Sequence, residues 1–351
     1  MKYRLLDVLA CSCCGANLAL KGEIISPVKS IVDKNAVRNP HCSSFCGLYS
    51  VPIAERKNFD CFACFQKEIV EGTLCCTKCG KTYPVKESIP QLLSGNERDK
   101  GADQVRKKFE FQWQAWGHEK KIFGREHEEN TQFILRGHSL LSPDYFKGKL
   151  VLDAGCGHGR FLKSFSCLGA EAIGIDFGSG IGIAKKFNES DGFVHTVMGD
   201  LTRLPLKKES FDYIFCSGVI HHTAHPQKTF SNLVSSLKKG GVIFIWVYPK
   251  QSVLWESSQK FLRSFLTRLP SRVLYYLCFI PVPLLSFVKT YSNTSLKTAS
   301  WRQCAQVIYD WYSPKYQFHY TPDELKAWFG SEGMGDLEPF YIKTGLGGRK
   351  I

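Results

Sequence analysis

A short apolar run that ends in an acid and opens into a glycine-rich turn constrains this chain more than any other feature. Residues 150–152 are apolar, and Asp153 ends the run. Gly155, Gly157 and Gly159 then occupy alternate positions. A buried strand followed by such a turn and a helix builds a nucleotide-binding loop at the carboxyl edge of a parallel sheet, and glycine lets the backbone approach the ligand closely. The stretch therefore predicts an α/β fold with a nucleoside-like ligand.

The same turn excludes two phosphate-binding loops. No Gly-Lys-Ser/Thr follows it, as a triphosphate-binding loop requires, and the third glycine comes too early for the dinucleotide fingerprint. The carboxylate of Asp153 repels phosphate and suits a ligand with positive charge. The stretch from Asp153 to Gly159 resembles motif I of class I S-adenosylmethionine (SAM)-dependent methyltransferases, whose ligand carries a sulfonium and an ammonium. This resemblance implies that SAM is the cofactor.

Two further acids follow predicted strands and support a SAM site. Residues 171–176 predict a second strand that ends in Asp176, whose carboxylate can accept the ribose hydroxyls of a nucleoside. Residues 194–198 predict a third strand ahead of Asp200. The resemblance implies that Asp200 contacts the adenine amino group while Leu201 packs on the ring. The expected cofactor-binding residues are Asp153, Gly155, Cys156, Gly157, Gly159, Asp176, Phe177, Asp200, Leu201 and Ser217.

Strand and helix patterns alternate along the middle of the chain. Residues 211–216 and 242–248 predict the fourth and fifth strands, with helices between successive strands. This alternation predicts a doubly wound, Rossmann-like α/β fold with a parallel sheet. Thr321 and Glu324 have capping-box spacing for a last helix, and residues 337–343 with the end of the chain predict a β-hairpin. The resemblance implies that this hairpin completes a seven-stranded methyltransferase sheet.

The segment after the fourth strand bears on the methyl acceptor. It reads GVIHHT from Gly218 to Thr223 and resembles type 11 and ubiquinone/menaquinone methyltransferases, which act on small molecules at carbon or oxygen. The Asn/Asp-Pro-Pro-Tyr/Phe motif of many enzymes that methylate base amines is absent. We therefore expect a small-molecule or lipid-like acceptor. His221 and His222 are candidate catalytic bases, because neutral imidazole accepts a proton at pH 7; the alternative is that they orient the loop or contact SAM.

The cysteines are concentrated near the start of the chain. Of fifteen, ten precede Gly80, and two pairs there share the pattern C-x-x-C-G. Four thiolates from two such pairs complete a tetrahedral zinc site. Clustered pairs without an apolar leader segment favour metal in a reducing compartment over disulfides, so we expect a cytoplasmic protein. The expected Zn²⁺ ligands are Cys11, Cys14, Cys76 and Cys79.

Four more cysteines lie between these two pairs. Cys42 and Cys46 have the spacing C-x3-C, and Cys61 and Cys64 the spacing C-x2-C. This pattern is compatible with a second zinc site and equally with buried thiols that bind no metal. The residues by themselves leave both interpretations open.

Both ends of the cysteine-rich segment resemble a known module. The letters LLDVLACSCC at residues 5–14 and YPVKESIPQLL at residues 83–93 resemble the small zinc-ribbon protein that activates several tRNA- and protein-modifying methyltransferases. The resemblance implies a zinc-ribbon-like domain over residues 1–93, enlarged by a cysteine-bearing insertion. It also implies that this domain docks on a methyltransferase domain and stabilises it, with both in one chain.

The rest of the chain divides by composition. We expect a linker and helical lid over residues 94–148, the SAM-binding core over 149–249, a helical and apolar cap over 250–320, and the final helix and hairpin over 321–351. Phe109, Trp113 and Trp116 share one face of the lid helix, where they pack in the core or cover the cofactor. Residues 273–288 are apolar but too short and too proline-interrupted for a membrane span. They suggest a cap over the acceptor or, alternatively, peripheral contact with an anionic membrane.

The charge of the chain bears on its partners. The net charge is +14 over 351 residues, which suits an acidic partner such as RNA, an anionic membrane or an anionic small substrate. No nucleic-acid recognition motif accompanies this charge, so we rank nucleic acid below a small molecule. The alternative function is an RNA-modifying methyltransferase. The alternative of another class is a non-catalytic scaffold that binds SAM and zinc.

Overall fold

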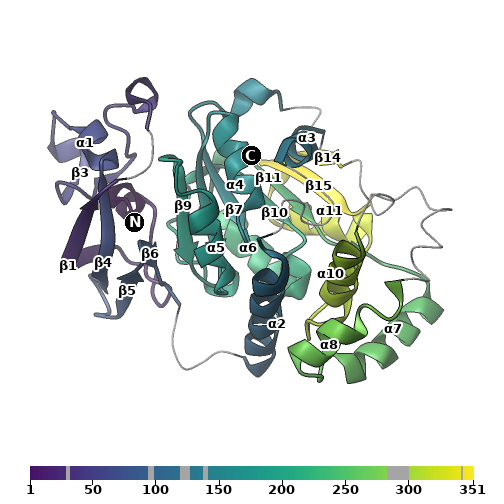
Figure 1. Ribbon diagram of the computed structural model, residues 1–351. Helices are drawn as coiled ribbons and strands as arrows, with labels where there is room; N and C mark the ends of the chain where they lie inside the picture. The colour runs from purple at the N-terminus through teal and green to yellow at the C-terminus, as the bar shows by residue number, and fades with distance from the viewer. Residues whose placement is uncertain (29–31, 94–98, 119–126, 137–140, 283–299, 341–342) are drawn as a thin grey trace.

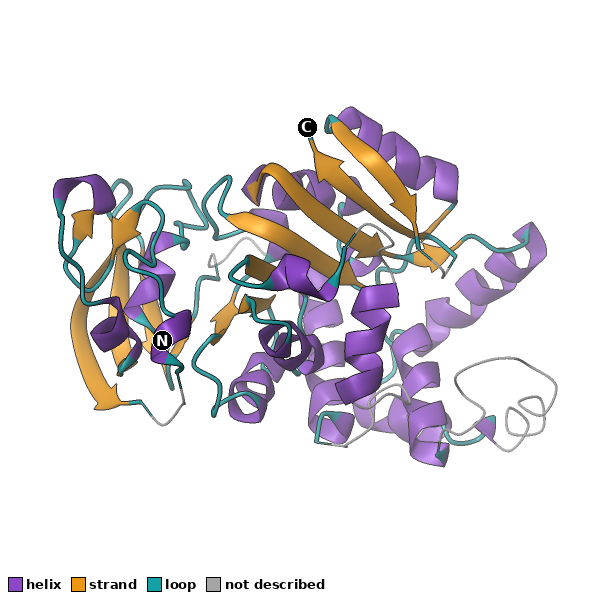
Figure 2. Ribbon diagram, turned by 90° about the horizontal axis from the view of Figure 1, so that it is seen from above, coloured by secondary structure: helices purple, strands orange, loops and turns teal. Residues whose placement is uncertain are grey.

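A computed structural model gives the fold and describes residues 1–28, 32–93, 99–118, 127–136, 141–282, 300–340 and 343–351. A small sheet near the N-terminus lies beside a larger sheet (Figure 1). Helices flank the larger sheet on both sides (Figure 2). The two sheets belong to the two parts of the chain that the sequence predicted, a zinc-ribbon-like part and an α/β part.

The larger sheet has seven strands. They are β7 (Leu150–Ala154), β8 (Glu171–Asp176), β9 (Val194–Met198), β10 (Phe211–Ser217), β11 (Leu237–Trp246), β14 (Met334–Pro339) and β15 (Gly345–Lys350). Their order is β14-β15-β11-β10-β7-β8-β9. The strands from β11 to β9 are parallel, whereas β15 is antiparallel to β11 and β14. This confirms the predicted Rossmann-like sheet and its closing hairpin, although β11 begins earlier than residue 242.

Helices cover this sheet because strand side chains alternate between two apolar faces. Val151 and Phe215 belong to the buried cluster on one face, and Leu152 and Ile214 to the cluster on the other. The first face carries α3 (His127–Arg136), α4 (Arg160–Cys167) and α5 (Gly180–Phe187), and the second carries α6 (Pro226–Ser236) and α11 (Pro322–Ser331). With both faces covered, the carboxyl edge of the parallel strands is left for a ligand.

The zinc-ribbon module, residues 1–93, has a sheet of its own. Its antiparallel strands are β1 (Leu18–Pro27), β4 (Lys67–Cys76), β5 (Thr82–Lys86) and β6 (Ile89–Pro90), in that spatial order. The insertion between β1 and β4 holds η2 (Lys34–Ala36), β2 (Phe45–Cys46), β3 (Val51–Pro52), η3 (Ile53–Glu55) and α1 (Cys61–Phe65). A 3-10 helix, η1 (Tyr3–Asp7), precedes the sheet.

The zinc-ribbon module packs directly on the edge of the larger sheet. Leu5 and Leu9 belong to the same buried cluster as Leu152 and Val197. The Leu92 N–H donates to the carbonyl of Met198 at 2.7 Å, at the end of the edge strand β9. The module therefore covers an edge of the sheet whose backbone groups need partners, and the two parts share one hydrophobic core.

Helix α2 links the cap to the rest of the protein. The described helices of the cap are α7 (Val253–Leu266), α8 (Ser271–Leu277) and α10 (Trp301–Tyr312). Helix α2 (Lys100–Trp116) lies beside the cap. The short strands β12 (Tyr248–Pro249) and β13 (His319–Tyr320) lie nearby. Trp116 of α2 is buried with Leu274 and Tyr309 of the cap. Gln104 donates to the carbonyls of Thr267 and Ser313 at 2.9 and 3.1 Å, so α2 is bonded to the cap as well as packed on it.

Two predicted segments extend beyond the described residues. In the linker and helical lid predicted over 94–148, a second helix is described from His127 to Arg136, and the flanking positions 119–126 and 137–140 lie outside the description. The apolar run at 273–288 is described as far as Val282, with 283–288 outside it. Within the described part of the chain, every helix is too short or too polar to cross a membrane.

Candidate functional site

The glycine-rich turn has the strained backbone that its sequence predicts. Gly155, Gly157 and Gly159 have φ values of +78°, +56° and +83°, which favour glycine over any other residue. A Cβ at Gly155 would lie 2.4 Å from the side chain of Val219, so the turn is also closely packed. The carbonyl of Ile175 accepts the Gly155 N–H at 2.8 Å, which ties the turn to β8.

Asp153 is a buried acid that lacks a full set of partners. Its side chain is 3% exposed, and its Oδ2 has no hydrogen-bond partner among the described residues. Burial raises its pKa to about 7, despite the nearby charge of Arg160. A buried carboxylate is costly without a counter-charge, so Asp153 is suited to hold a cationic group of a ligand.

Asp176 lies at the end of the neighbouring strand and holds the turn. Its carboxylate accepts the Gly157 N–H at 3.0 Å and the Gly178 N–H at 2.9 Å. Burial raises its pKa, and these backbone donors oppose that rise. The side chain is only half-buried, so part of the carboxylate remains available to hydroxyl groups.

The other predicted cofactor residues lie on the same edge of the sheet, because β10, β7, β8 and β9 are parallel neighbours. Ser217 ends β10 and Phe177 follows β8, and both are half-buried. Asp200 follows β9, and its side chain accepts the Thr202 N–H at 2.8 Å as the cap of a short 3-10 helix that begins at the buried Leu201. Cys156 is buried within the turn, consistent with a packing role.

Trp113 of α2 lies over the glycine-rich turn. Its ring stacks on His158 with centroids 5.0 Å apart. A Cβ at either Gly157 or Gly180 would lie 2.6 Å from this ring. Glu110, one turn earlier on α2, accepts the Ser179 N–H at 3.0 Å. The tryptophan that the sequence analysis assigned to core packing or to a cofactor lid therefore contacts the predicted cofactor loop itself.

One ring nitrogen of His222 has a hydrogen-bond partner and the other has none among the described residues. Its Nδ1 lies 2.9 Å from the carbonyl oxygen of Tyr316. Because a carbonyl can only accept, Nδ1 carries the proton and Nε2 presents a lone pair. Nε2 is buried and has no hydrogen-bond partner in the described chain. Burial lowers the pKa of His222 to about 4, so the ring is neutral at pH 7 and can accept a proton.

His221 is placed differently from its neighbour. It is fully buried, and its ring lies 4.1 Å from that of Tyr248. Burial lowers its pKa well below the usual value, and its backbone carbonyl accepts the Phe318 N–H at 3.0 Å. Both of its ring nitrogens are buried without a hydrogen-bond partner among the described residues. The contact of His222 Nδ1 with the carbonyl of Tyr316 fixes a tautomer that His221 lacks, which makes His222 the better candidate base.

Asp310 of the cap is a site residue that the sequence analysis did not single out. Its carboxylate accepts from Gln112 Nε2 at 3.0 Å and from the Tyr248 hydroxyl. It thereby joins α10 to the lid helix and to β12, next to the two histidines. The signal in the sequence was the segment from Tyr309 to Tyr320, in which Asp310 begins the pattern D-x-x-S-P and whose residues were expected either to line an acceptor pocket or to pack the cap.

The first cysteine quartet forms a cluster of metal-binding geometry. The Sγ atoms of Cys11, Cys14, Cys76 and Cys79 all lie within 4.8 Å of one another. The Cys11–Cys79 and Cys14–Cys76 sulfur distances are 3.7 and 3.5 Å. Sulfurs at 2.3 Å from a tetrahedral zinc lie about 3.8 Å apart, so the four residues fit a zinc ion.

The second cysteine quartet is gathered less tightly. Cys42, Cys46, Cys61 and Cys64 line one small cavity of about 10 Å³. Within the described ranges, however, the first quartet alone meets the mutual distance of 4.8 Å. The fold therefore brings the four thiols to one place without setting them at metal-binding distances.

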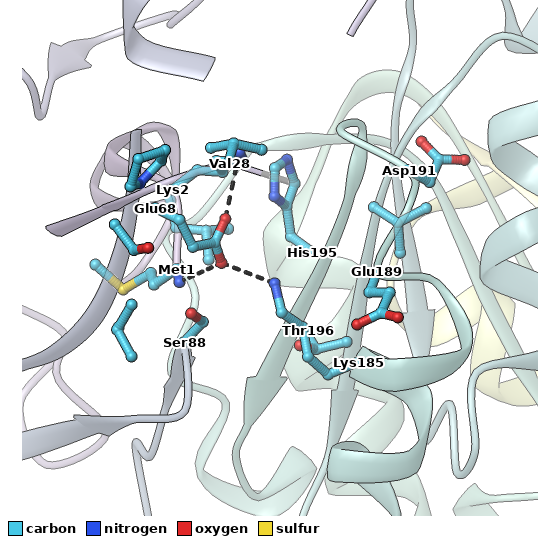
Figure 3. A pocket seen from close by; sticks show the side chains of 15 residues that line it. Met1, Lys2, Val28, Glu68, Ser88, Lys185, Glu189, Asp191, His195 and Thr196 are labelled. Atoms are coloured by element: carbon cyan, nitrogen blue, oxygen red, sulfur yellow. Dashed lines mark hydrogen bonds and ion pairs between the residues drawn. The ribbon is translucent and has the colours of Figure 1, made fainter. Parts of the chain in front are cut away.

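A larger cavity lies between the zinc-ribbon module and the core. It has a volume of about 270 Å³ and contains none of the predicted site residues. Glu68 points into it and pairs with Lys185 of α5 at 2.7 Å and with the amino group of Met1 at 2.8 Å (Figure 3). These ion pairs join the two parts of the chain, and the carboxylate of Glu68 is satisfied by them.

Comparison with known proteins identifies both parts of the chain. A family model described as a methyltransferase domain matches residues 152–245. A second model, described as Trm112p-like protein, matches residues 2–88. The chain thus combines a methyltransferase domain with the fold of SAM-dependent methyltransferases and an N-terminal Trm112p-like domain. This confirms both family resemblances that the sequence suggested.

Individual relatives match only part of their own length. A tRNA U34 carboxymethyltransferase from Campylobacter hominis is 38% identical over 112 residues, or 30% of this chain and 39% of that protein. A ubiquinone biosynthesis O-methyltransferase from Coxiella burnetii is 32% identical over 100 residues, or 28% of this chain and 43% of that protein. A solved complex between the Haloferax volcanii Trm112 methyltransferase activator and a methyltransferase matches at 21% identity with a TM-score of 0.36, covering 44% of this chain and 66% of that one. The chain therefore spans less than half the length of these two curated relatives.

These findings correct the expected acceptor. The sequence predicts a small-molecule or lipid-like acceptor, with peripheral membrane contact as an option and RNA as the second choice. The similarity to a tRNA-modifying enzyme and the Trm112p-like domain beside the methyltransferase domain contradict that order. The expectation rested on the GVIHHT loop, whose histidines are buried against the cap. Buried residues beside the cofactor loop do not report the size of the acceptor, so the loop was a poor guide.

Proposed function

We propose that this protein transfers a methyl group from SAM to RNA, with tRNA as the first acceptor to test. The observation that carries the proposal is the Trm112p-like module packed into the core of a methyltransferase domain that is similar to a tRNA U34 carboxymethyltransferase. The net charge of +14 supports an anionic acceptor, because Lys and Arg side chains release counterions from a phosphate backbone on binding.

The residues at the carboxyl edge of the sheet fit SAM. The orphaned oxygen of Asp153 suits the ammonium group, and the positive-φ glycines let the backbone lie close to the ligand. Asp176 is placed for the ribose hydroxyls, and Trp113 for covering the bound cofactor. When bound, SAM supplies a methyl group activated by its sulfonium. The protein then contributes mainly alignment, because the leaving group is already good.

His222 is the residue we assign to proton removal. Its Nε2 lone pair is buried and unpartnered, and its tautomer is fixed by Tyr316. As the acceptor atom forms its bond to the methyl group, the proton it loses passes to Nε2. Gln112, Asp310 and Tyr248 form the hydrogen-bonded wall beside this position, which connects the lid helix to the acceptor side of the site.

The first cysteine quartet would hold a structural zinc ion in the zinc-ribbon module. All four ligands are protein thiols, which leaves no open position for catalysis. The ion would fix the ends of β1 and β4, which carry or flank the cysteine pairs. Its contribution to the activity is therefore indirect, through a module that is packed on the edge of the core sheet.

The experiment that tests the proposal uses the full chain and SAM labelled in its methyl group. We expect label in purified bulk tRNA, removal of that label by ribonuclease, and a methylated nucleoside on mass spectrometry. Because U34 is the position named for the similar enzyme, the wobble uridine is the first position to map. Weaker labelling at higher salt is also expected for a basic protein on RNA.

The matched control is the Gly157→Ala variant, which keeps the fold of the zinc-ribbon module but disturbs the cofactor loop. At a SAM concentration below the Kd of the wild type, it should label RNA about tenfold less. The RNA substrates are tRNA, ribosomal RNA and messenger RNA purified from cells that lack the gene. Absence of label from all three would contradict an RNA acceptor. Label that remains after ribonuclease treatment would contradict it as well.

A further inference from the structure

We propose that Cys42, Cys46, Cys61 and Cys64 bind a second zinc ion, which clamps the insertion of the zinc-ribbon module against the methyltransferase core. This inference does not depend on the identity of the methyl acceptor. The four residues occur as two close pairs, from the loop and β2 on one side and from α1 on the other. Two close pairs of thiols are the usual source of a four-cysteine zinc site.

Within its described residues, the insertion has only a small core of its own. Its regular structure is two 3-10 helices, two strands of two residues each and one helix of five residues. Its separate hydrophobic cluster has three buried residues, Cys46, Phe59 and Cys61. Segments with so little apolar burial are normally held by a disulfide or a metal ion. The structure joins none of these four described cysteines in a disulfide, and the proposal assigns the holding role to a metal ion.

The cysteines converge on one small space. Their exposed fractions are 8%, 4%, 8% and 5% for Cys42, Cys46, Cys61 and Cys64, and all four line the same cavity. Its volume of about 10 Å³ is close to that of a single water-sized sphere, and a zinc ion is smaller than that. The His41 N–H donates to Cys61 Sγ at 3.3 Å, and donors of this kind stabilise a metal-bound thiolate.

Zinc binding requires the thiols to move inward from their present positions. Zn–S bonds of about 2.3 Å place sulfurs about 3.8 Å apart, and this quartet is more widely spread than the first. The cavity between the sulfurs provides the space for that movement. Cys42 and Cys46 flank a segment that is bonded to Asp7, so the inward movement is one of the cysteine side chains.

The position of the quartet explains what the ion would stabilise. Arg4 and His41 also line the cavity, and both pair with Glu171 of the core, at 3.2 and 3.1 Å. The Ser43 and Phe45 N–H groups, between Cys42 and Cys46, each donate to the carboxylate of Asp7 on η1 at 2.7 Å. An ion bound at the quartet would therefore fix the loop that joins the insertion both to η1 and to the core.

Native mass spectrometry of the full wild-type chain tests the proposal directly. We expect two zinc ions per chain. One zinc ion per chain, in protein purified without chelators and with zinc in the medium, would overturn the second site. A disulfide among the four cysteines would also overturn the proposal. Differential alkylation detects it: free thiols are blocked in freshly purified protein, and thiols released by a later reduction are labelled separately.

Variants assign the two ions to their sites. Cys61→Ser with Cys64→Ser should lower the content from two to one, whereas Cys76→Ser with Cys79→Ser should remove the other ion. Cys75→Ser is the matched control, because Cys75 is outside both quartets, and should keep two. Retention of both ions in the Cys61/Cys64 double variant would contradict the proposal. If that variant does not fold, the wild-type stoichiometry still decides the question.

Discussion

Arg4 of the zinc-ribbon module and Glu171 of the methyltransferase core form a buried ion pair with a separation of 3.2 Å, although they are 167 positions apart in the chain. Glu171 also lies 3.1 Å from His41 Nε2 and 3.0 Å from His195 Nε2. Burial acts to raise the pKa of Glu171, but the charge of Arg4 and the histidine contacts outweigh it and hold the pKa well below the usual value. One carboxylate at the start of β8 therefore joins both modules.

Replacing Glu171 by alanine should destabilise the protein strongly. The change removes the interdomain partner of Arg4, which is 3% exposed and keeps its second pair, with Asp7 at 2.7 Å, so we expect the lower end of the range that follows. Removing one partner of a buried ion pair costs about 3–5 kcal/mol. Urea unfolding of the full chain measures this loss. Asp144→Ala, which breaks an exposed pair with Lys147, is the control and should leave the midpoint unchanged. Equal midpoints for the two variants would show that the buried pair does not hold the modules together.

Gly157→Ala should weaken SAM binding by a factor of about ten or more, equivalent to about 1.4 kcal/mol. An alanine at this position has to adopt a φ of +56°, and its Cβ would lie 2.6 Å from the Trp113 ring. Isothermal titration calorimetry with SAM measures the affinity. Gly182→Ala is the control, because its Cβ would meet nothing within 4 Å, and its affinity should equal that of the wild type. A wild-type affinity for Gly157→Ala would mean that SAM does not use this turn.

His222→Ala should lower turnover by about 100-fold, the lower range for loss of a general base, while SAM affinity stays unchanged. Turnover is measured by methyl transfer to the acceptor under saturating SAM. His225→Ala, which changes an exposed histidine on the same loop, should behave like the wild type. Turnover of His222→Ala within a factor of two of the wild type would assign His222 to loop orientation instead.

The pH dependence of turnover offers a separate check on His222. Burial lowers its pKa to about 4, so the ring remains neutral and able to accept a proton well below pH 6.5. We expect turnover at saturating SAM to show no loss near pH 6.5 from this group. A decline centred near pH 6.5 that disappears in His222→Gln would place the ring in a more solvated environment than the structure shows.

SAM affinity should depend on pH through Asp153. Burial raises the pKa of this carboxyl to about 7 in the free protein, so it is largely ionised above pH 7 and largely protonated below it. A cationic ligand binds the ionised form more tightly, so affinity should fall as pH drops below 7, by at most about tenfold per unit. Calorimetry from pH 6 to pH 8 measures the slope. Asp153→Asn should bind more weakly and show a flatter profile, and an unchanged slope in that variant would exclude Asp153 as the source.

Local sequence predicted the parts of this protein that depend on neighbouring residues. The strand, acid and glycine order from residue 150 to Gly159 produces the observed turn, because only glycine takes those φ values at low cost. The helix from Pro322 has the capping box that Thr321 and Glu324 predict. The C-x-x-C-G spacing places each cysteine pair in a knuckle, because that geometry is fixed within a few residues.

The sequence motifs did not predict the class of the methyl acceptor correctly. The loop from Gly218 to Thr223 predicted a small-molecule enzyme, whereas the similarity of the core to a tRNA-modifying enzyme and the Trm112p-like domain favour RNA. The motif describes a buried segment beside the cofactor loop. The cap, the lid and the attached module, which surround the site, come from distant parts of the chain.

By itself, the sequence determined the Rossmann-like sheet, the cofactor loop and the first cysteine quartet, because strand alternation, glycine turns and knuckles are local properties. Only the tertiary structure decided that Trp113 covers the loop, that Gln112 bonds Asp310 across 198 residues, and that Arg4 meets Glu171. It also fixed the tautomer of His222 through the carbonyl of Tyr316, whereas neither ring nitrogen of His221 has a hydrogen-bond partner among the described residues. These contacts depend on how distant elements pack, and that packing is set by the burial of the whole core, which no short motif encodes.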